Sequence, residues 1–121
     1  MALSDGYVAL YTVDLQTEHY AEFSASEDVD SLGVAKEGDD FFRQSFVNAE
    51  SYCYAEDLQR FREQFTRENV LQSIRKDGRF SISYRLMIHG KQQQVTLKAV
   101  LLKNGNSDKL LIGVRAWKDR K

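Results

Sequence analysis

The sequence contains no proline and only one cysteine, Cys53, among its 121 residues. A single cysteine cannot form a disulfide within the chain, which favours a reducing compartment. No apolar stretch approaches the ~20 residues that a membrane-spanning helix needs. The N-terminus also lacks the basic and apolar regions of a signal peptide. We therefore expect a cytoplasmic protein that does not insert into a membrane.

An excess of positive charge is also missing, since the formal net charge is −1. Proteins that bind nucleic acid neutralise phosphates with basic side chains, so we expect no nucleic-acid partner. The short basic end, Lys118 to Lys121, is typical of a solvated terminus. The length suits one core, and no repeat or linker divides the chain, so residues 1–121 are predicted to form one domain.

The last third of the chain predicts three consecutive antiparallel strands. Apolar residues alternate with others, and a period of two indicates a sheet with one face in the core. His89-Gly90 and Asn104-Gly105 fall between the strands, where hairpins need residues with positive φ. The residues expected to face the core are Phe80, Ile82, Tyr84, Leu86, Ile88, Val95, Leu97, Ala99, Leu101, Leu110, Ile112, Val114 and Ala116.

The opposite face of this predicted sheet carries apolar residues where polar ones are usual. They are Val100, Leu102, Leu111 and Trp117. A contiguous exposed apolar patch usually marks a contact with a partner. We therefore expect these residues at a dimer or domain interface, or alternatively covered by a helix or the N-terminal arm of the chain itself.

The first two thirds predict a hairpin followed by helices. Residues 7–14 and 19–24 are rich in aromatic and β-branched residues and predict two strands, and residues 24–38 predict a loop or a marginal helix. Asp39 and Asp40 are expected to open a short helix with their carboxylates at its first turn, and residues 48–54 to form a loop. A second helix is expected from Ala55, and a third is capped by Thr66 and stopped by Gly78.

Together these elements predict an α+β fold. Its single sheet has five antiparallel strands, and the helices between the second and third strands cover one face.

Residues for catalysis or metal binding are hard to find. Nucleophilic catalysis needs a nucleophile, a base and an orienting group, and neither His19 nor His89 lies in such a pattern. No H-x-x-x-H or clustered Cys/His spacing predicts a metal site. The acidic residues of 27–40 lack the spacing of a calcium loop. We therefore expect no enzyme and no metal.

Four stretches, taken in order, carry a family resemblance. They are Val13-Asp14-Leu15-Gln16-Thr17, Tyr54-Ala55-Glu56-Asp57-Leu58, Phe80-Ser81-Ile82-Ser83-Tyr84-Arg85 and Leu111-Ile112-Gly113-Val114. The chain resembles the PAS (Per-Arnt-Sim) sensory domains, which commonly show a His-Pro-Asp/Glu-Asp helix start, an f-x-x-e-Y-R strand and an l-i-G-v ending. Tyr54 and Ala55 replace the His and Pro, and Trp117-Lys118-Asp119 replaces the frequent Asp-Ile-Thr end.

The resemblance implies a non-catalytic module of bacterial signal transduction. Such a module binds a small ligand, dimerises, or does both, and so regulates an attached output domain such as a diguanylate cyclase or a histidine kinase. It also implies that the chain is part of a larger protein. Haem is not expected, because residues 55–75 contain no histidine for an axial ligand. Flavin is not expected either, because Cys53 lies outside the Asn-Cys-Arg-Phe-Leu type of motif.

In this family the helices and the concave sheet face enclose the ligand. The lining expected here is Phe41, Phe42, Phe46, Leu58, Phe61, Phe65, Tyr84, Leu86, Leu97 and Ile112, with Tyr84 and Tyr11 able to orient a ligand. A small apolar or aromatic molecule suits such a site better than a charged one. The same residues could instead fill a closed core, which would make the chain a structural interaction domain.

Two further alternatives concern chemistry. Cys53 is expected to be a small buried residue, although a helix N-terminus near it would favour a reactive thiolate. An enzyme of the ketosteroid-isomerase sort, a small cone-like α+β fold, is the other alternative. The strands before the first helix argue against it, as does the lack of Asp or Glu on the inner face of Phe80–Ala116.

Overall fold

The computed structural model describes residues 7–25, 37–104 and 107–116. These residues form six strands and three helices, and all strand pairs are antiparallel within one sheet of order β3-β2-β1-β6-β5-β4. The predicted α+β class is confirmed. The elements are β1 (Tyr7–Asp14), β2 (Tyr20–Ala25), β3 (Glu37–Gly38), α2 (Phe41–Tyr52), α3 (Ala55–Gln64), α4 (Arg67–Asp77), β4 (Phe80–Ile88), β5 (Lys91–Asn104) and β6 (Ser107–Ala116).

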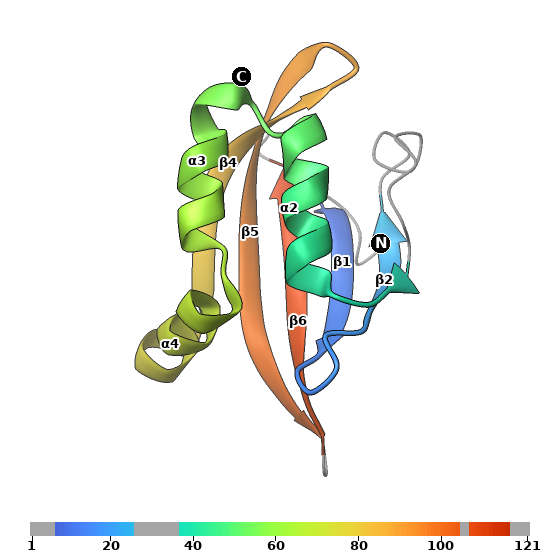
Figure 1. Cartoon of the computed structure of the whole chain (residues 1–121), viewed down its shortest axis with the longest axis vertical. Coiled ribbons are helices and arrows are strands. Elements are labelled where there is room, and N and C mark those ends of the chain that lie inside the picture. The colour runs from blue at the N-terminus through green and yellow to red at the C-terminus, as the bar shows by residue number, and fades with distance from the viewer. Residues whose placement is uncertain (1–6, 26–36, 105–106, 117–121) are drawn as a thin grey trace.

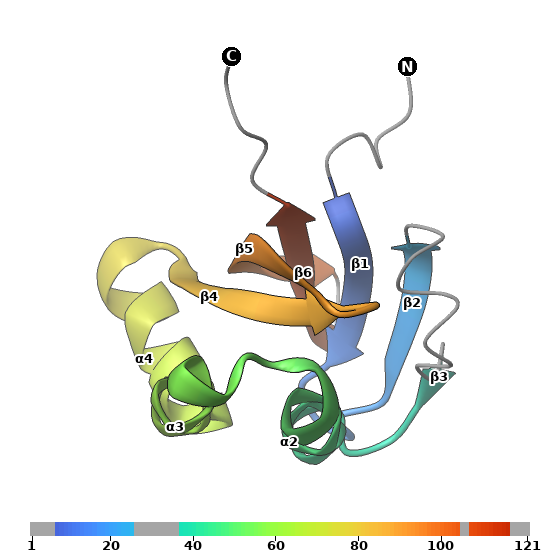
Figure 2. The same ribbon diagram turned by 90° about the horizontal axis from the view of Figure 1, so that it is seen from above.

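The helices lie on one face of a curved sheet. Figures 1 and 2 show α2 and α3 side by side over the inner face, with α4 beside the end of β4 where that strand begins. Within the described residues, no helix covers the outer face. The core lies between the two layers, and the predicted core-facing residues of β4, β5 and β6 are buried or half-buried there. None of the described helices is long and apolar enough to cross a bilayer.

The prediction of five strands, with the helices between the second and third, is wrong. Glu37 and Gly38 form β3 and pair with Ala21 and Tyr20 of β2, so the helices follow the third strand. Backbone hydrogen bonding needs no hydrophobic alternation, so a strand of two residues leaves no pattern in the sequence. Gly38 also lies close to the Tyr20 ring, where an added Cβ would come within 3.1 Å of the hydroxyl oxygen.

The start of α2 also differs from the prediction. Asp40 precedes the helix in the left-handed region, with φ of 58°, and its side chain makes no capping hydrogen bond. The Asp39 carboxylate binds the Nδ1 atom of His19 at 3.0 Å. The expectation that these two carboxylates satisfy the first turn of the helix is therefore wrong, because Asp39 is bound by His19 and Asp40 makes no capping bond.

The end of α2 lies beyond the predicted one. The helix continues to Tyr52, through residues that the sequence predicted as a loop. Ala49 is buried against the core, and the side chain of Gln44 donates a hydrogen bond to Asn48 at 3.1 Å one turn later. Tertiary burial of one small residue thus extends a segment with modest helix propensity.

The remaining turns follow the predictions where the structure describes them. Thr66 accepts a hydrogen bond from the backbone N–H of Asn69 at 3.1 Å, which caps α4. Gly78 ends that helix with φ of 85°. His89 and Gly90 both have positive φ, as the hairpin between β4 and β5 requires. Gly105 and Asn106 of the other predicted turn lie outside the described residues.

The edge strand β4 is covered by the connection between α2 and α3. Cys53 forms an isolated antiparallel bridge with Leu86, and the Tyr54 N–H donates to the Arg85 carbonyl at 2.8 Å. The Arg85 N–H donates in turn to the Asp57 carboxylate at 2.8 Å. These bonds satisfy backbone groups that would otherwise be open at the sheet edge, and they fix Cys53 over the inner face.

Candidate functional site

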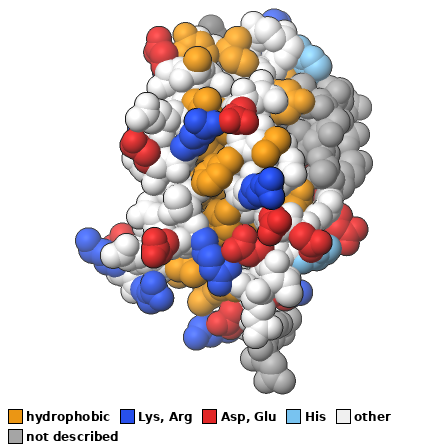
Figure 3. Space-filling model, in the orientation of Figure 1, with side chains coloured by type: hydrophobic (Ala, Val, Ile, Leu, Met, Phe, Trp, Pro, Cys, Tyr) orange, Lys and Arg blue, Asp and Glu red, His pale blue; other side chains and the backbone are white. Residues whose placement is uncertain are grey.

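A cavity of about 120 Å³ lies between the helices and the inner face of the sheet. Helix α2 supplies one wall, α3 the side, and β1, β4, β5 and β6 the floor. Figure 3 views the molecule from this helix side, and hydrophobic side chains show between the charged ones over the middle of the face. The lining consists of Ala9, Tyr11, Tyr20, Phe41, Gln44, Ser45, Asn48, Ala49, Tyr52, Cys53, Phe61, Phe65, Tyr84, Leu86, Leu97, Ile112 and Val114.

Seven of the ten residues expected around a pocket lie on this lining. They are Phe41, Phe61, Phe65, Tyr84, Leu86, Leu97 and Ile112. Phe42 lies elsewhere in the core, where its ring contacts that of Phe65 at a centroid distance of 5.2 Å. Phe46 and Leu58 are partly buried at the edge of the core and do not reach the cavity.

Of the polar residues that α2 contributes, helical spacing placed Ser45 on the side of Phe41, but the sequence did not indicate Gln44 or Asn48. Gln44, Ser45 and Asn48 lie one and two turns after Phe41, so they share its side of the helix. The helical spacing was present in the sequence, but the segment from Asn48 onwards was predicted as a loop. The wall opposite the sheet is therefore more polar than the apolar pattern predicted.

Aromatic rings make up much of the cavity wall. The Tyr84 and Phe61 rings are tilted at a centroid distance of 4.8 Å, and the Tyr11 and Phe41 rings at 5.7 Å. Phe65 connects the two groups through its ring contacts with Phe61 and Phe41. Tilted and edge-to-face pairs of this kind are the favoured ring arrangements, so the wall is well packed around the remaining space.

The polar groups on the floor are neutral. Burial raises the pKa of the Tyr84 hydroxyl, and the nearby Cys53 thiol and Tyr11 hydroxyl raise it further. Burial likewise raises the pKa of Tyr11. The pKa of Cys53 is raised to about 11, first by burial and then by the charge of Asp57. These groups stay protonated at neutral pH, and the alternative of a reactive Cys53 thiolate loses its support.

Asp57 and Arg85 hold α3 against the edge of the sheet. The Arg85 Nε and Nη2 atoms each donate to the Asp57 carboxylate at 2.9 Å. The Arg85 guanidinium also lies 4.4 Å from the centre of the Tyr54 ring. Hydrogen bonding from Arg85 holds the pKa of Asp57 below its usual value. The two motifs that contain these residues were noted separately in the sequence, where nothing indicated that they touch.

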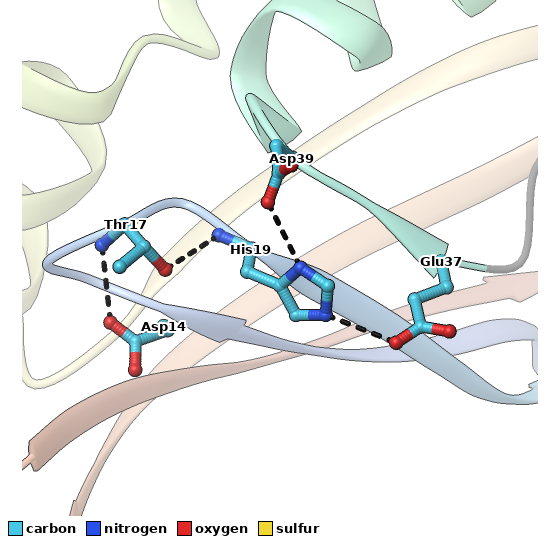
Figure 4. A network of polar contacts seen from close by, with 5 residues as sticks. All are labelled: Asp14, Thr17, His19, Glu37 and Asp39. Atoms are coloured by element: carbon cyan, nitrogen blue, oxygen red, sulfur yellow. Dashed lines mark hydrogen bonds and ion pairs between the residues drawn. The ribbon is translucent and has the colours of Figure 1, made fainter.

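His19 joins the start of β2 to β3 and to the approach of α2. Its Nδ1 lies 3.0 Å from Asp39 and its Nε2 lies 3.2 Å from Glu37. Figure 4 shows the imidazole ring between the two carboxylates. Hydrogen bonding to Asp39, and then to Glu37, raises the pKa of His19. With a carboxylate on each ring nitrogen, the imidazolium form is favoured. Within the described residues no group of three His, Cys, Asp or Glu side chains could hold a metal ion.

The predicted interface residues lie on the outer face of the sheet. Val100 of β5 and Leu111 of β6 pair directly across the strands and are half-buried. Leu102 is 40% exposed, which is unusual for a large hydrophobic residue in this protein. Trp117 lies outside the described residues. The outer face therefore carries an apolar patch on two neighbouring strands.

Comparison with models of known protein families gave no match to this chain. Comparison with curated proteins gave no match either.

Proposed function

We propose that this chain is a PAS-like, non-catalytic sensory module of bacterial signal transduction. A small molecule held in the cavity under α2 would regulate an attached output domain, such as a diguanylate cyclase or a histidine kinase. The observation that carries the proposal is a neutral, aromatic-lined cavity of about 120 Å³ between the helices and the concave sheet face. The bonds between Asp57 and Arg85 add support, because they join two of the motifs on which the resemblance rests.

The fold offers a route from the cavity to both chain ends. Tyr11 of β1 and Ile112 of β6 both line the cavity and pair with each other across the two strands. The same strand pair continues to Tyr7 and Arg115, where β1 begins and β6 ends. A ligand that favours one arrangement of these strands would act on both flanking segments together. It can shift that equilibrium only by its difference in affinity for the two arrangements.

Native mass spectrometry of the purified chain tests the proposal. We expect a mass above that of the denatured chain, which extraction would trace to a bound small molecule. Ala49→Leu should abolish this extra mass, because Ala49 lines the cavity. Val47→Leu is the matched control, since Val47 is on the same helix and 48% exposed. If no mass is found and no member of a metabolite library raises the melting temperature, the cavity is only a packing space.

A second candidate function is self-association or docking of a neighbouring domain through the outer sheet face. It is favoured by Leu102, which is 40% exposed beside the pair Val100 and Leu111. Sedimentation equilibrium should give a dimer that Leu102→Glu dissociates, whereas Val47→Glu on the helix side leaves it intact. A strict monomer at high concentration would contradict self-association. A dimer with an empty cavity would favour a structural interaction domain.

The enzyme alternative gains little from the structure. On the inner face of β4, β5 and β6, Asp108 alternates with the inward-facing Leu110, but it is exposed near the start of β6 and does not line the cavity. Glu22 of β2 shares the inner face with its pairing partner Tyr11, and after burial its charge is the next cause of the raised pKa of the Tyr11 hydroxyl. It is not among the residues that line the cavity. One carboxylate beside the cavity falls short of the acid, base and nucleophile that catalysis requires.

A further inference from the structure

The cavity lining contains no charged side chain. None of its residues is Asp, Glu, Lys, Arg or His. The ionisable groups on its floor, Tyr11, Tyr84 and Cys53, all have raised pKa values and are neutral near pH 7. An anionic ligand would lose its hydration without gaining a positive counter-charge from the lining, and the charges of Glu22 and Asp57, which act on Tyr11 and Cys53, would repel it. The lining therefore favours an uncharged occupant over an anion.

The volume suits an occupant the size of a single ring. An apolar cavity of roughly 150 Å³ is known to take up benzene, and this cavity measures about 120 Å³. The cavity opens to solvent on one side, so a two-ring cofactor or a nucleotide would extend out of the enclosed space. The rings of Phe41, Phe61 and Tyr84 surround the space, and aromatic pairs gain attraction beyond their buried area. Size and surroundings together favour an aromatic ring over an aliphatic chain.

One end of the cavity offers hydrogen bonds to such a ring. Tyr84 is only 6% exposed and lines the cavity. Among the described residues, none makes a hydrogen bond to its hydroxyl. The Tyr84 oxygen is not among the fully enclosed side-chain atoms that lack a partner, so it keeps some accessible surface and a ligand in the cavity can bond to it. The Cys53 thiol and the Tyr11 hydroxyl lie close enough to the Tyr84 hydroxyl to interact with it electrostatically.

We propose that the ligand of this cavity is an uncharged single-ring aromatic molecule with one hydrogen-bonding substituent, of the phenol class, whose substituent binds the Tyr84 hydroxyl. The inference rests on the proposed function, because it assumes that the cavity holds a ligand. It specifies the ligand by three properties of the lining: neutrality, volume and the hydroxyl at its end.

Calorimetric titration of the full chain with phenol, toluene and benzoate tests the inference. Phenol should bind about fivefold to tenfold more tightly than toluene, because only phenol can bond to Tyr84. Benzoate should not bind. Tyr84→Phe should reduce the affinity for phenol to that for toluene and leave toluene unchanged. Tyr54→Phe is the matched control, since the Tyr54 ring lies outside the cavity and its loss of a hydroxyl should change neither affinity.

The other outcomes separate the ligand class from the proposed function. If toluene binds as tightly as phenol, or benzoate binds more tightly than either, the cavity takes a ligand but the phenol class is wrong. If Tyr84→Phe leaves phenol binding unchanged, the assigned hydrogen bond is wrong. If no probe binds but library screening finds a charged or larger ligand that Ala49→Leu excludes, only this inference fails. If screening also finds nothing, the proposed function fails with it.

Discussion

Asp57 of α3 accepts three hydrogen bonds from a single residue, Arg85 of the edge strand β4, at 2.8, 2.9 and 2.9 Å. One bond comes from the backbone N–H and two from the guanidinium. Asp57 is only 6% exposed, so water has little access to replace these bonds if they are lost. The pair therefore holds the helix that forms the side of the cavity against the sheet.

Replacing Asp57 with Asn should lower the free energy of unfolding by about 2 kcal/mol, because buried hydrogen bonds to a charge are lost. Urea denaturation would measure the change. Glu50→Gln is the control, since Glu50 forms an exposed ion pair with Arg62. This substitution should change the free energy of unfolding by less than about 0.5 kcal/mol. An equally small effect of Asp57→Asn would contradict the role assigned to the pair.

The pKa of Asp57 predicts how the stability of the folded protein depends on pH. The pKa of Asp57 is lower in the folded protein than its ordinary value of 3.8, because Arg85 binds the ionised form. Its contribution is therefore fully present above pH ~4 and is lost as the pH falls through the folded pKa. We expect the stability difference between wild type and Asp57→Asn to shrink on acidification below pH 4. A difference that stays constant down to pH 2 would argue against this linkage.

His19 predicts the opposite dependence of stability on pH. Its folded pKa lies above the ordinary value of 6.5, because Asp39 and Glu37 bind the imidazolium. This contribution is present below pH ~6.5 and is lost as the pH rises through the folded pKa. Proton NMR titration should show that Asp39→Asn lowers the pKa of His19, whereas Asp108→Asn, on an exposed residue, does not. No change in the Asp39→Asn variant would mean that the contact does not persist in solution.

Phe65 should be among the most sensitive core positions. Its side chain is fully buried and contacts the rings of Phe41, Phe42, Phe61 and Phe80. Phe65→Ala should lower the free energy of unfolding by about 3–5 kcal/mol, because it removes buried area and leaves a cavity. Phe65→Leu should lower the free energy of unfolding by less than Phe65→Ala does, so that this variant stays folded for measurement. A loss below about 1 kcal/mol for Phe65→Ala would show that the site is loosely packed.

Cys53 should react slowly with thiol reagents. It is 8% exposed, and its pKa is raised to about 11. The thiolate is the reactive species, so modification at pH 8 should be far slower than in the guanidinium-unfolded chain. Spectrophotometric titration with a disulfide reagent would compare the two rates. A fast-reacting thiol in the folded protein would restore the alternative of a reactive Cys53 thiolate.

The sequence by itself determined the elements whose pattern is local. Period-two alternation predicted β4, β5 and β6 with their buried faces, because side chains of a strand alternate between core and solvent. Thr66 and Gly78 predicted the two ends of α4, because capping and positive φ depend on residues within one turn. Phe41, Phe61, Phe65 and Tyr84 of the cavity wall were expected from the family resemblance, whereas Tyr20 and Tyr52 were not.

The tertiary structure decided what depends on contacts between distant residues. Strand β3 exists because the backbone of Glu37 and Gly38 meets the open edge of β2, which no side-chain pattern encodes. The bonds between Asp57 and Arg85 join residues 28 positions apart. The extension of α2 from Asn48 to Tyr52, which places both of these residues on the cavity wall, accompanies burial of Ala49 against the core. Such contacts are set by the packing of whole elements, and only the folded chain brings their residues together.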